Sequence, residues 1–200
     1  MRGATLIRAG ALPCTPWKNG GGATREIAVF PPGSGLDDFV WRVSLADVAS
    51  AGPFSRFDGI ERSLLLLAGA GMRLDEEGGT SHRLEHAFDR LDFAGETAIV
   101  AHPLAGATRD FNLMLRRGAA EGTIDIVRAP QEARLGDEQV LLFCATGEAA
   151  IRLDDEAALT LTAEDTLYVD PARGRRCRID GDGVVLRVGI RLSAPGEETR

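Results

Sequence analysis

The chain has 200 residues, of which 44% are hydrophobic, and its formal net charge is −7 at pH 7. The apolar fraction is enough for a sizeable core and excludes a disordered chain. The acidic balance disfavours nonspecific binding to nucleic acid or to an anionic membrane surface. The 24 glycines and nine prolines favour many short strands joined by turns over long helices.

Nothing in the sequence indicates a membrane span, a secretory leader or a disulfide framework. Apolar runs such as Leu64 to Ala68 are far shorter than a membrane span, and the N-terminal run is too short for a secretory signal. The three cysteines, Cys14, Cys144 and Cys177, are odd in number, widely spaced and lack a C-x-x-C motif. We therefore expect a cytoplasmic protein in a reducing compartment.

Strand signals are numerous and short, whereas a helical period is hard to find over any long window. Apolar or alternating segments bounded by Gly, Pro, Asp or Asn recur along the whole chain. In chain order the predicted strands are 23–30, 39–45, 64–67, 97–101, 111–116, 123–128, 140–144, 149–153, 159–161, 166–169, 176–179 and 184–190. The chain is therefore predicted to be all-β.

The sequence also contains an internal repeat, which predicts two copies of one antiparallel β unit. Glu96, Pro103 and Gly106 match Glu164, Pro171 and Gly174 at an offset of 68 residues, and Arg73–Asp75 match Arg152–Asp154 at an offset of 79. We place the two units at residues 1–118 and 119–200. Packed antiparallel units of this kind form a sandwich or barrel without long exposed edges.

The repeat resembles cupins, on the runs LLLLAGAGMRL and GETAIVAHPLAG. The resemblance implies a double cupin, or bicupin, and it places the four metal-ligand positions of a cupin at Ser55, Phe57, Arg62 and Arg109, with Cys177 as the second-repeat equivalent of Arg109. Imidazole and carboxylate are the ligands that suit first-row metals. None of the four first-repeat residues is such a ligand, so no metal and no cofactor is predicted.

Arginines therefore occupy former metal positions in this alignment. The guanidinium groups of Arg62 and Arg109 are planar forks that match carboxylate or phosphate. The alternative, that both arginines form structural ion pairs at the barrel rim, stays open.

The least ordinary stretch is PWKNGGGATREIAVF, residues 16–30. Three consecutive glycines lose much conformational freedom on folding and make sense where the chain bends sharply or approaches another group closely. In the strand that follows, Arg25 points to the opposite face from Glu26. A charged side chain inside an all-β domain needs a partner or a ligand. Pairing of Glu26 with Arg42 on a neighbouring strand would supply a structural partner instead.

Three further segments carry aromatic, amide or charged residues that suit a binding site. In FVWRVS, Trp41 lies on one face, and Arg42 and Ser44 lie on the other. Phe54 belongs to a loop that could line a pocket or cover the core. In RDFNLMLRR, Asp110 and Asn112 share a face, where they could hydrogen-bond a ligand amide or cap a turn.

Together, PWKNGGGATREIA, FVWRVSLADV, GPFSRFDGIERSLLLLAGAGM and DFNLMLRRG resemble, in order, the pattern of the HutD/Ves family. The resemblance spans about residues 5 to 118 and is weaker in the second repeat. It implies a metal-free double cupin. It also implies an association with bacterial histidine utilisation, in which the protein would bind an intermediate such as N-formylglutamate or urocanate and restrain pathway expression.

We predict a non-enzymatic binding protein for a small carboxylate, with a pocket in the first unit and a second unit that is mainly scaffold. The predicted site residues are Asn19, Arg25, Glu26, Trp41, Arg42, Ser44, Phe54, Arg62, Asp110 and Asn112. Arginines would supply charge, Asn19, Ser44, Asp110 and Asn112 oriented hydrogen bonds, and the aromatic residues an apolar wall. No nucleic acid or membrane partner is predicted, and a homodimer is compatible with the sequence.

Three alternatives remain open from the sequence. One is a metal-independent lyase or isomerase acting on a small carboxylate, with Glu26 or Asp110 as general base, although no acid/base pair is visible. Another is a protein of the stress-associated Ves branch. The third is a structural scaffold in which the duplicated barrel serves dimerisation.

Overall fold

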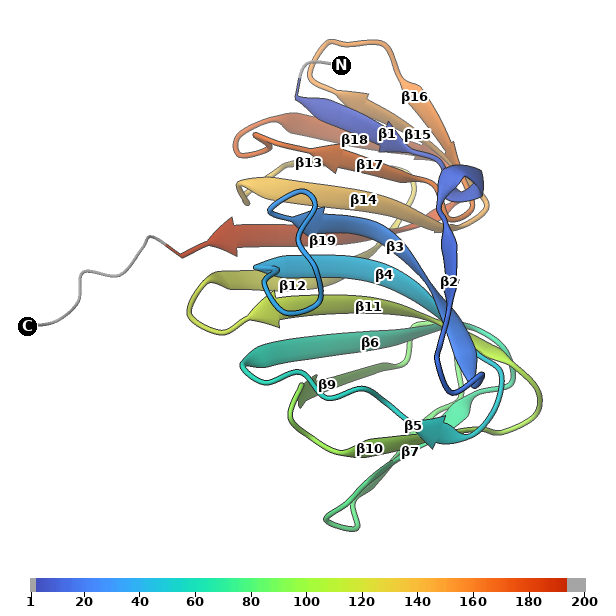
Figure 1. The fold of residues 1–200 in the computed structure, drawn as a ribbon. Helices are drawn as coiled ribbons and strands as arrows, with labels where there is room; N and C mark the ends of the chain where they lie inside the picture. The colour runs from blue at the N-terminus through green and yellow to red at the C-terminus, as the bar shows by residue number, and fades with distance from the viewer. Residues whose placement is uncertain (1–2, 194–200) are drawn as a thin grey trace, which may run out of the picture. The chain divides into compact units, whose positions relative to one another are not determined.

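The computed structural model describes residues 3–193 and is built almost entirely of antiparallel β-strands (Figure 1). Every strand pairing in this range is antiparallel. The described residues contain one 3-10 helix, η1 (Ala9–Ala11), and no α-helix. None of their helices has the length and apolar character that crossing a membrane requires. The all-β prediction is confirmed.

The chain divides into two compact units. The first unit, Leu12–Gly118, contains one sheet of six strands and one of four. The six-stranded sheet has the order β2 (Cys14–Pro16), β3 (Gly22–Phe30), β4 (Trp41–Val48), β11 (Thr108–Arg116), β6 (Ile60–Ala68), β9 (Arg90–Ala94). The four-stranded sheet has the order β5 (Gly52–Pro53), β10 (Ile99–Pro103), β7 (Met72–Glu76), β8 (Ser81–Leu84). A cluster of buried side chains from both sheets, including Leu64, Leu74 and Ile99, forms the core.

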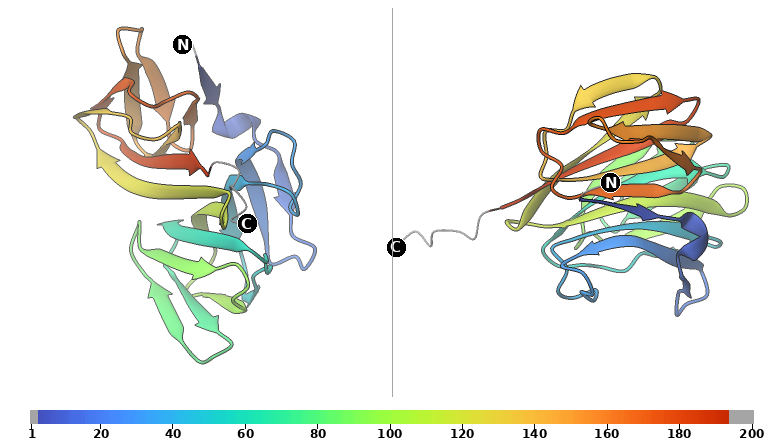
Figure 2. Two further views of the ribbon diagram at one scale, coloured as in Figure 1. Left: turned by 90° about the vertical axis from the view of Figure 1, so that its left-hand side faces the viewer. Right: turned by 90° about the horizontal axis from the view of Figure 1, so that it is seen from above.

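The second unit combines the N-terminal segment up to Ala11 with the chain from Ala119 onward. Its five-stranded sheet has the order β1 (Ala4–Ile7), β17 (Thr166–Val169), β14 (Gln139–Thr146), β19 (Val184–Leu192), β12 (Ala120–Arg128). Its four-stranded sheet has the order β13 (Gln131–Arg134), β18 (Arg176–Gly181), β15 (Glu148–Leu153), β16 (Leu159–Thr162). The two sheets of each unit are visible as separate layers in the left view of Figure 2.

The position of β1 differs from the predicted boundary, which assigned residues 1–118 to one unit. In Figure 1 the dark blue strand β1 runs beside the orange strand β17, with which it pairs from Ala4↔Val169 to Ile7↔Thr166. The physical reason is that Leu6 packs against the core of the second unit. Arg8 adds an ion pair with Asp165 at 2.7 Å. Sequence order alone could not reveal this pairing.

Both units have the same strand plan, as the repeat predicted. The order β9–β6–β11–β4 of the first unit recurs as β17–β14–β19–β12, and β5–β10–β7–β8 recurs as β13–β18–β15–β16. The match of Arg73–Asp75 with Arg152–Asp154 falls on the equivalent strands β7 and β15.

The match at an offset of 68 residues is wrong by one strand. It aligned β10 with β17, but the equivalent of β17 is β9. The true correspondence is fixed by Phe88 and Glu164, which both have positive φ and donate their N–H groups to Leu66 O at 2.7 Å and Cys144 O at 2.6 Å. Cys177, on β18, is therefore not the equivalent of Arg109, on β11. Short Pro/Gly turn sequences recur at many turns, so they do not fix strand correspondence.

Candidate functional site

The strand register brings most of the predicted polar residues onto one face of the six-stranded sheet. Ser44 lies opposite Glu26 on β3 and opposite Asn112 on β11, and Asn112 in turn lies opposite Leu64 on β6. Residues directly opposite one another in an antiparallel sheet share a face. Because Leu64 belongs to the core of the first unit, this face is the interior of that unit.

A chain of buried polar groups runs along this interior face from Arg62 to Asp110. The Arg62 Nη2 donates to Asn112 Oδ1 at 3.1 Å, and Asn112 Nδ2 donates to Asp110 Oδ1. Arg62 is 8% exposed and Asp110 is 0% exposed. Arg62 Nε and Asp110 Oδ2 are both buried without a hydrogen-bond partner. The chain therefore ends in one unsatisfied donor and one unsatisfied acceptor, each of which is costly to leave unpaired.

Burial shifts the pKa values of both charged ends of this chain towards their neutral forms. Desolvation raises the pKa of Asp110 to about 7, although the charge of Arg62 and the hydrogen bond from Asn112 oppose the shift. Desolvation likewise lowers the pKa of Arg62 to about 10, against the attraction of Asp110. Arg62 stays charged at neutral pH, whereas Asp110 titrates there.

Three aromatic rings surround the guanidinium of Arg62. Its Cζ lies 5.4 Å from the ring centroid of Phe54, 5.7 Å from that of Phe57 and 4.8 Å from that of Phe93. Such distances allow cation–π attraction. Arg62 Nη1 also donates to the backbone oxygen of Ser55 at 3.3 Å. The guanidinium of Arg62 therefore contacts three aromatic rings, the side-chain oxygen of Asn112 and the backbone oxygen of Ser55.

A second charged pair lies on the same face. Arg42 Nε donates to Glu26 Oε2 at 2.7 Å, and Arg42 Nη1 lies 3.4 Å from Ser44 Oγ and 4.0 Å from Met114 Sδ. The pairing of Glu26 with Arg42 that the sequence left open as a structural alternative is therefore present. Arg42 also lowers the pKa of Arg62 by like-charge repulsion. The charges of the two arginines therefore influence each other.

Three predicted site residues lie elsewhere. Arg25 and Trp41 are on the opposite face of the sheet, where Arg25 pairs with Asp47 at 3.2 Å and Trp41 stacks on Phe30 with ring centroids 6.0 Å apart. Strand alternation separates both side chains from the face that carries Arg42. Asn19 lies in the turn after β2, where its Oδ1 accepts from the Gly21 N–H at 3.0 Å.

The four former metal positions do not stay together in the structure. Ser55, Phe57 and Arg62 do gather, because Arg62 reaches the backbone of Ser55 and the ring of Phe57. Arg109 instead lies on the opposite face of its strand and pairs with Asp47 at 2.6 Å. Within residues 3–193 no three His, Cys, Asp or Glu side chains are grouped so that they could hold a metal ion.

Sequence reasoning missed Phe93 and Met114. Phe93 lies opposite Arg62 across β9 and β6, and Met114 lies opposite both Arg62 and Arg42. An apolar residue on a strand is typical of any core, so no local signal distinguished these two. The pairing of distant strands alone brings them to the site.

The HutD family model matches residues 9–187 of the chain. A 21.2 kDa protein encoded in the hutC 3′ region of Pseudomonas putida is 37% identical over 183 residues, which cover 88% of this chain and 95% of the relative. The chain belongs to the HutD family. The Ves protein of Escherichia fergusonii is 38% identical over 116 residues, covering 58% of this HutD-family chain and 59% of Ves.

Solved structures agree with this assignment. HutD from Pseudomonas fluorescens SBW25, determined in a formate condition, superposes with a TM-score of 0.83 at 29% identity, covering 96% of this chain and all of the other. Oxalate decarboxylase from Lactobacillus farciminis matches with a TM-score of 0.62 at 8% identity, covering 96% of this chain and 86% of the decarboxylase. The second likeness shows the fold alone. The predicted double cupin is confirmed, within a family linked to histidine utilisation.

Proposed function

We propose that this HutD-family chain is a non-enzymatic binding protein that holds a small carboxylate inside its first unit. The observation that carries the proposal is the state of Arg62. This guanidinium is buried, and among residues 3–193 it forms no ion pair with a carboxylate. Its Nε and the nearby Asp110 Oδ2 both lack partners.

A buried cation whose nearest carboxylate, Asp110, is reached only through Asn112 is incompletely compensated, and a carboxylate ligand would remove that penalty. Carboxylates bind arginine through paired, charge-assisted hydrogen bonds. Arg42 adds a second positive group on the same face, and Asn112 and Ser44 add oriented polar atoms. Phe54 supplies an apolar wall over the charged end.

Within the family's link to histidine utilisation, the ligand we propose is N-formylglutamate or urocanate. Formylglutamate offers one carboxylate for Arg62, a second that would share Arg42 with Glu26, and a formamide for Asp110 or Asn112. Binding in the cytoplasm would report the level of this intermediate and thereby modulate expression of histidine-utilisation genes. The relative encoded beside hutC in Pseudomonas putida supports this association.

Isothermal calorimetry tests the proposal with N-formylglutamate, urocanate, glutamate and histidine. We expect one of the first two to bind the wild type and to lose binding in Arg62→Met. Arg152→Met is the matched control, because Arg152 is an exposed strand arginine in the second unit. No binding of any of the four compounds at millimolar concentration would exclude this ligand class.

One observation favours a second candidate, a metal-independent lyase or isomerase acting on a small carboxylate. Asp110 is buried, has a free Oδ2, and its pKa is raised to about 7 by desolvation. A carboxyl group that titrates near neutrality can exchange protons with a bound substrate. Conversion of either intermediate, followed by NMR after exhaustive chelation and lost in Asp110→Asn but not in Glu26→Gln, would support this candidate and contradict a purely binding role.

A further inference from the structure

The charged end of the proposed site is closed to solvent. Arg62 is 8% exposed, and its Nε is fully covered, as is Asp110 Oδ2. A ligand carboxylate therefore cannot reach these atoms while the surrounding side chains keep their positions. Some part of the cover must move, so the residues that cover Arg62 determine how a ligand enters.

Two of the three rings over Arg62 pack against buried side chains, although the Phe57 ring is itself only partly buried. Phe93 lies directly opposite Arg62 on β9 and belongs to the core of the first unit. Phe57 packs edge-on against Phe39 with ring centroids 6.5 Å apart, and its backbone N–H donates to Gly95 O at 2.9 Å. Displacing either ring would disturb well-packed buried side chains.

The third ring, Phe54, is partly buried like Phe57 and also packs against the core of the first unit, but it lies in the irregular segment that follows β5, and its ring partner, Trp17, is itself partly exposed. The backbone N–H of Phe54 is held by Ile99 O at 2.9 Å, so rotation of the side chain, rather than movement of the backbone, would uncover Arg62. The Phe54 ring also meets the Trp17 indole edge-on, with ring centroids 6.4 Å apart.

The glycine-rich turn fixes the position of Trp17. The indole Nε1 donates to Thr24 Oγ1 at 2.8 Å, and the backbone N–H of Trp17 donates to Gly22 O at 2.9 Å. A Cβ on Gly22 would lie 3.0 Å from two atoms of the indole ring and 2.3 Å from Asp47 O. Gly20 adopts a φ of +70°, which glycine accepts without strain. The glycine run therefore seats the indole against the strand.

We infer that Phe54 and Trp17 form the gate of the ligand site. A carboxylate reaches Arg62 by displacing the Phe54 ring from the guanidinium, and Trp17 changes its surroundings as Phe54 turns away. Charge-assisted hydrogen bonds to a carboxylate are stronger than a partly exposed cation–π contact, so the exchange is favourable. This inference rests on the proposed function and adds the route by which a ligand reaches the site.

Tryptophan fluorescence during stopped-flow mixing with N-formylglutamate or urocanate tests the gate. The chain has two tryptophans, and Trp41 is buried on the other face of the sheet against Phe30. We expect a saturable change in emission that disappears in Trp17→Phe. We also expect Phe54→Leu to raise the association rate constant roughly threefold or more, because a required conformational change slows association. Phe30→Leu, which alters the partner of the other tryptophan, should leave this rate unchanged.

A ligand-free measurement tests the seat of Trp17. Gly22→Ala should expel the indole and increase acrylamide quenching, whereas Gly136→Ala, where an added Cβ meets nothing within 4 Å, should not. Unchanged quenching in Gly22→Ala would contradict the role of Gly22 in positioning the Trp17 indole.

Calorimetric binding with unchanged emission, or with equal association rates in Phe54→Leu and wild type, would overturn the gate and leave the proposed function intact. Absence of calorimetric binding would overturn both.

Discussion

The interiors of the two units differ although their strand plans are the same. Leu66 and Cys144 mark the equivalent points, since their N–H groups donate to Asp89 O and Asp165 O, each at 2.9 Å. Counting along the paired strands from these two points gives the equivalent positions in the two units. They are Arg62 and Val140, Asp110 and Val185, Asn112 and Arg187, and Ser44 and Asp125.

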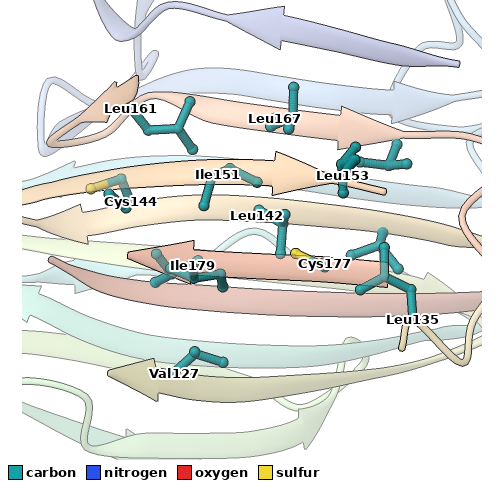
Figure 3. Close-up of a cluster of buried hydrophobic side chains, with 14 of the residues drawn as sticks. Val127, Leu135, Leu142, Cys144, Ile151, Leu153, Leu161, Leu167, Cys177 and Ile179 are labelled. Atoms are coloured by element: carbon teal, nitrogen blue, oxygen red, sulfur yellow. The ribbon is translucent and has the colours of Figure 1, made fainter. Parts of the chain in front are cut away.

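The second unit fills its interior with apolar side chains. Figure 3 shows Leu142, Ile151 and Ile179 among those that converge there. Its one polar pair at these equivalent positions, Arg187 with Asp125, forms an ion pair at 2.9 Å with side chains that are 27% and 51% exposed. A cavity of about 10 Å³ beside Cys177 and Arg187 has room for about one water molecule. The second unit therefore has an interior formed mainly by packed apolar side chains, whereas the first unit buries Arg62 and Asp110, which packing alone does not require.

The largest expected effect comes from placing the first unit's acid in the second unit. In Val185→Asp a carboxylate would enter a mainly apolar interior in which Arg187, on the same strand face, is already paired with Asp125. We expect the free energy of unfolding to fall by about 4 kcal/mol or more. Urea denaturation measures the change, with Val185→Ala as the control for lost volume. A loss no larger than that of the control would contradict the proposed difference between the interiors.

The reverse change makes the first unit resemble the second. Arg62→Val copies Val140, and we expect it to weaken binding of the proposed carboxylate about 100-fold or more, because the ligand would lose its buried charge partner. The free energy of unfolding should fall by about 1–3 kcal/mol, because the shorter apolar side chain leaves Asn112 Oδ1 without its donor and removes the charge that acts on Asp110. Calorimetry and urea denaturation give the two values. Retained affinity would remove Arg62 from the site.

Two buried aspartates should give opposite pH dependence. Desolvation raises the pKa of Asp110 to about 7 in the folded protein, so the folded state keeps a proton that the unfolded state has already lost. This contribution to stability is present below pH 4 and disappears as the pH rises towards 7. Asp110→Asn should therefore show a smaller loss of stability between pH 5 and pH 8 than the wild type, by about 2 kcal/mol. Equal slopes in urea denaturation would contradict a buried, protonated Asp110.

The smallest expected effect concerns Asp165, which anchors β1 to the second unit. Desolvation by itself would raise the pKa of Asp165, but hydrogen bonds from the Ala9 N–H, Arg8 and Thr162 outweigh it and leave the pKa below its ordinary value. Its contribution is present above pH 4 and is lost as the pH falls. Asp165→Asn should cost about 1–2 kcal/mol at pH 7 and less at pH 3. A similar loss at both values would show that charge has no part in this anchor.

Alternation and turn residues predicted most of the strands, although not β7, β8 and β9, and they predicted the duplication and the separation of Glu26 from Arg25. They also placed Arg42 and Ser44 on one face of a strand, which the structure bears out. The sequence signals were weakest for short edge strands such as β1 and β13, which have four residues each and depend on pairing with distant segments. The offset of 68 residues failed for the same reason, because matching turn residues do not specify which strand pairs with which.

By itself, the sequence determined that this chain is a duplicated β protein and which side chains share a strand face, because the period of two is a local property of the backbone. Only the tertiary structure decided which face is interior. It set Asn112 between Arg62 and Asp110, paired Arg109 with Asp47, and covered Arg62 with Phe54. These relations join strands far apart in the chain, and burial, which raises the pKa of Asp110, exists only once those strands have packed.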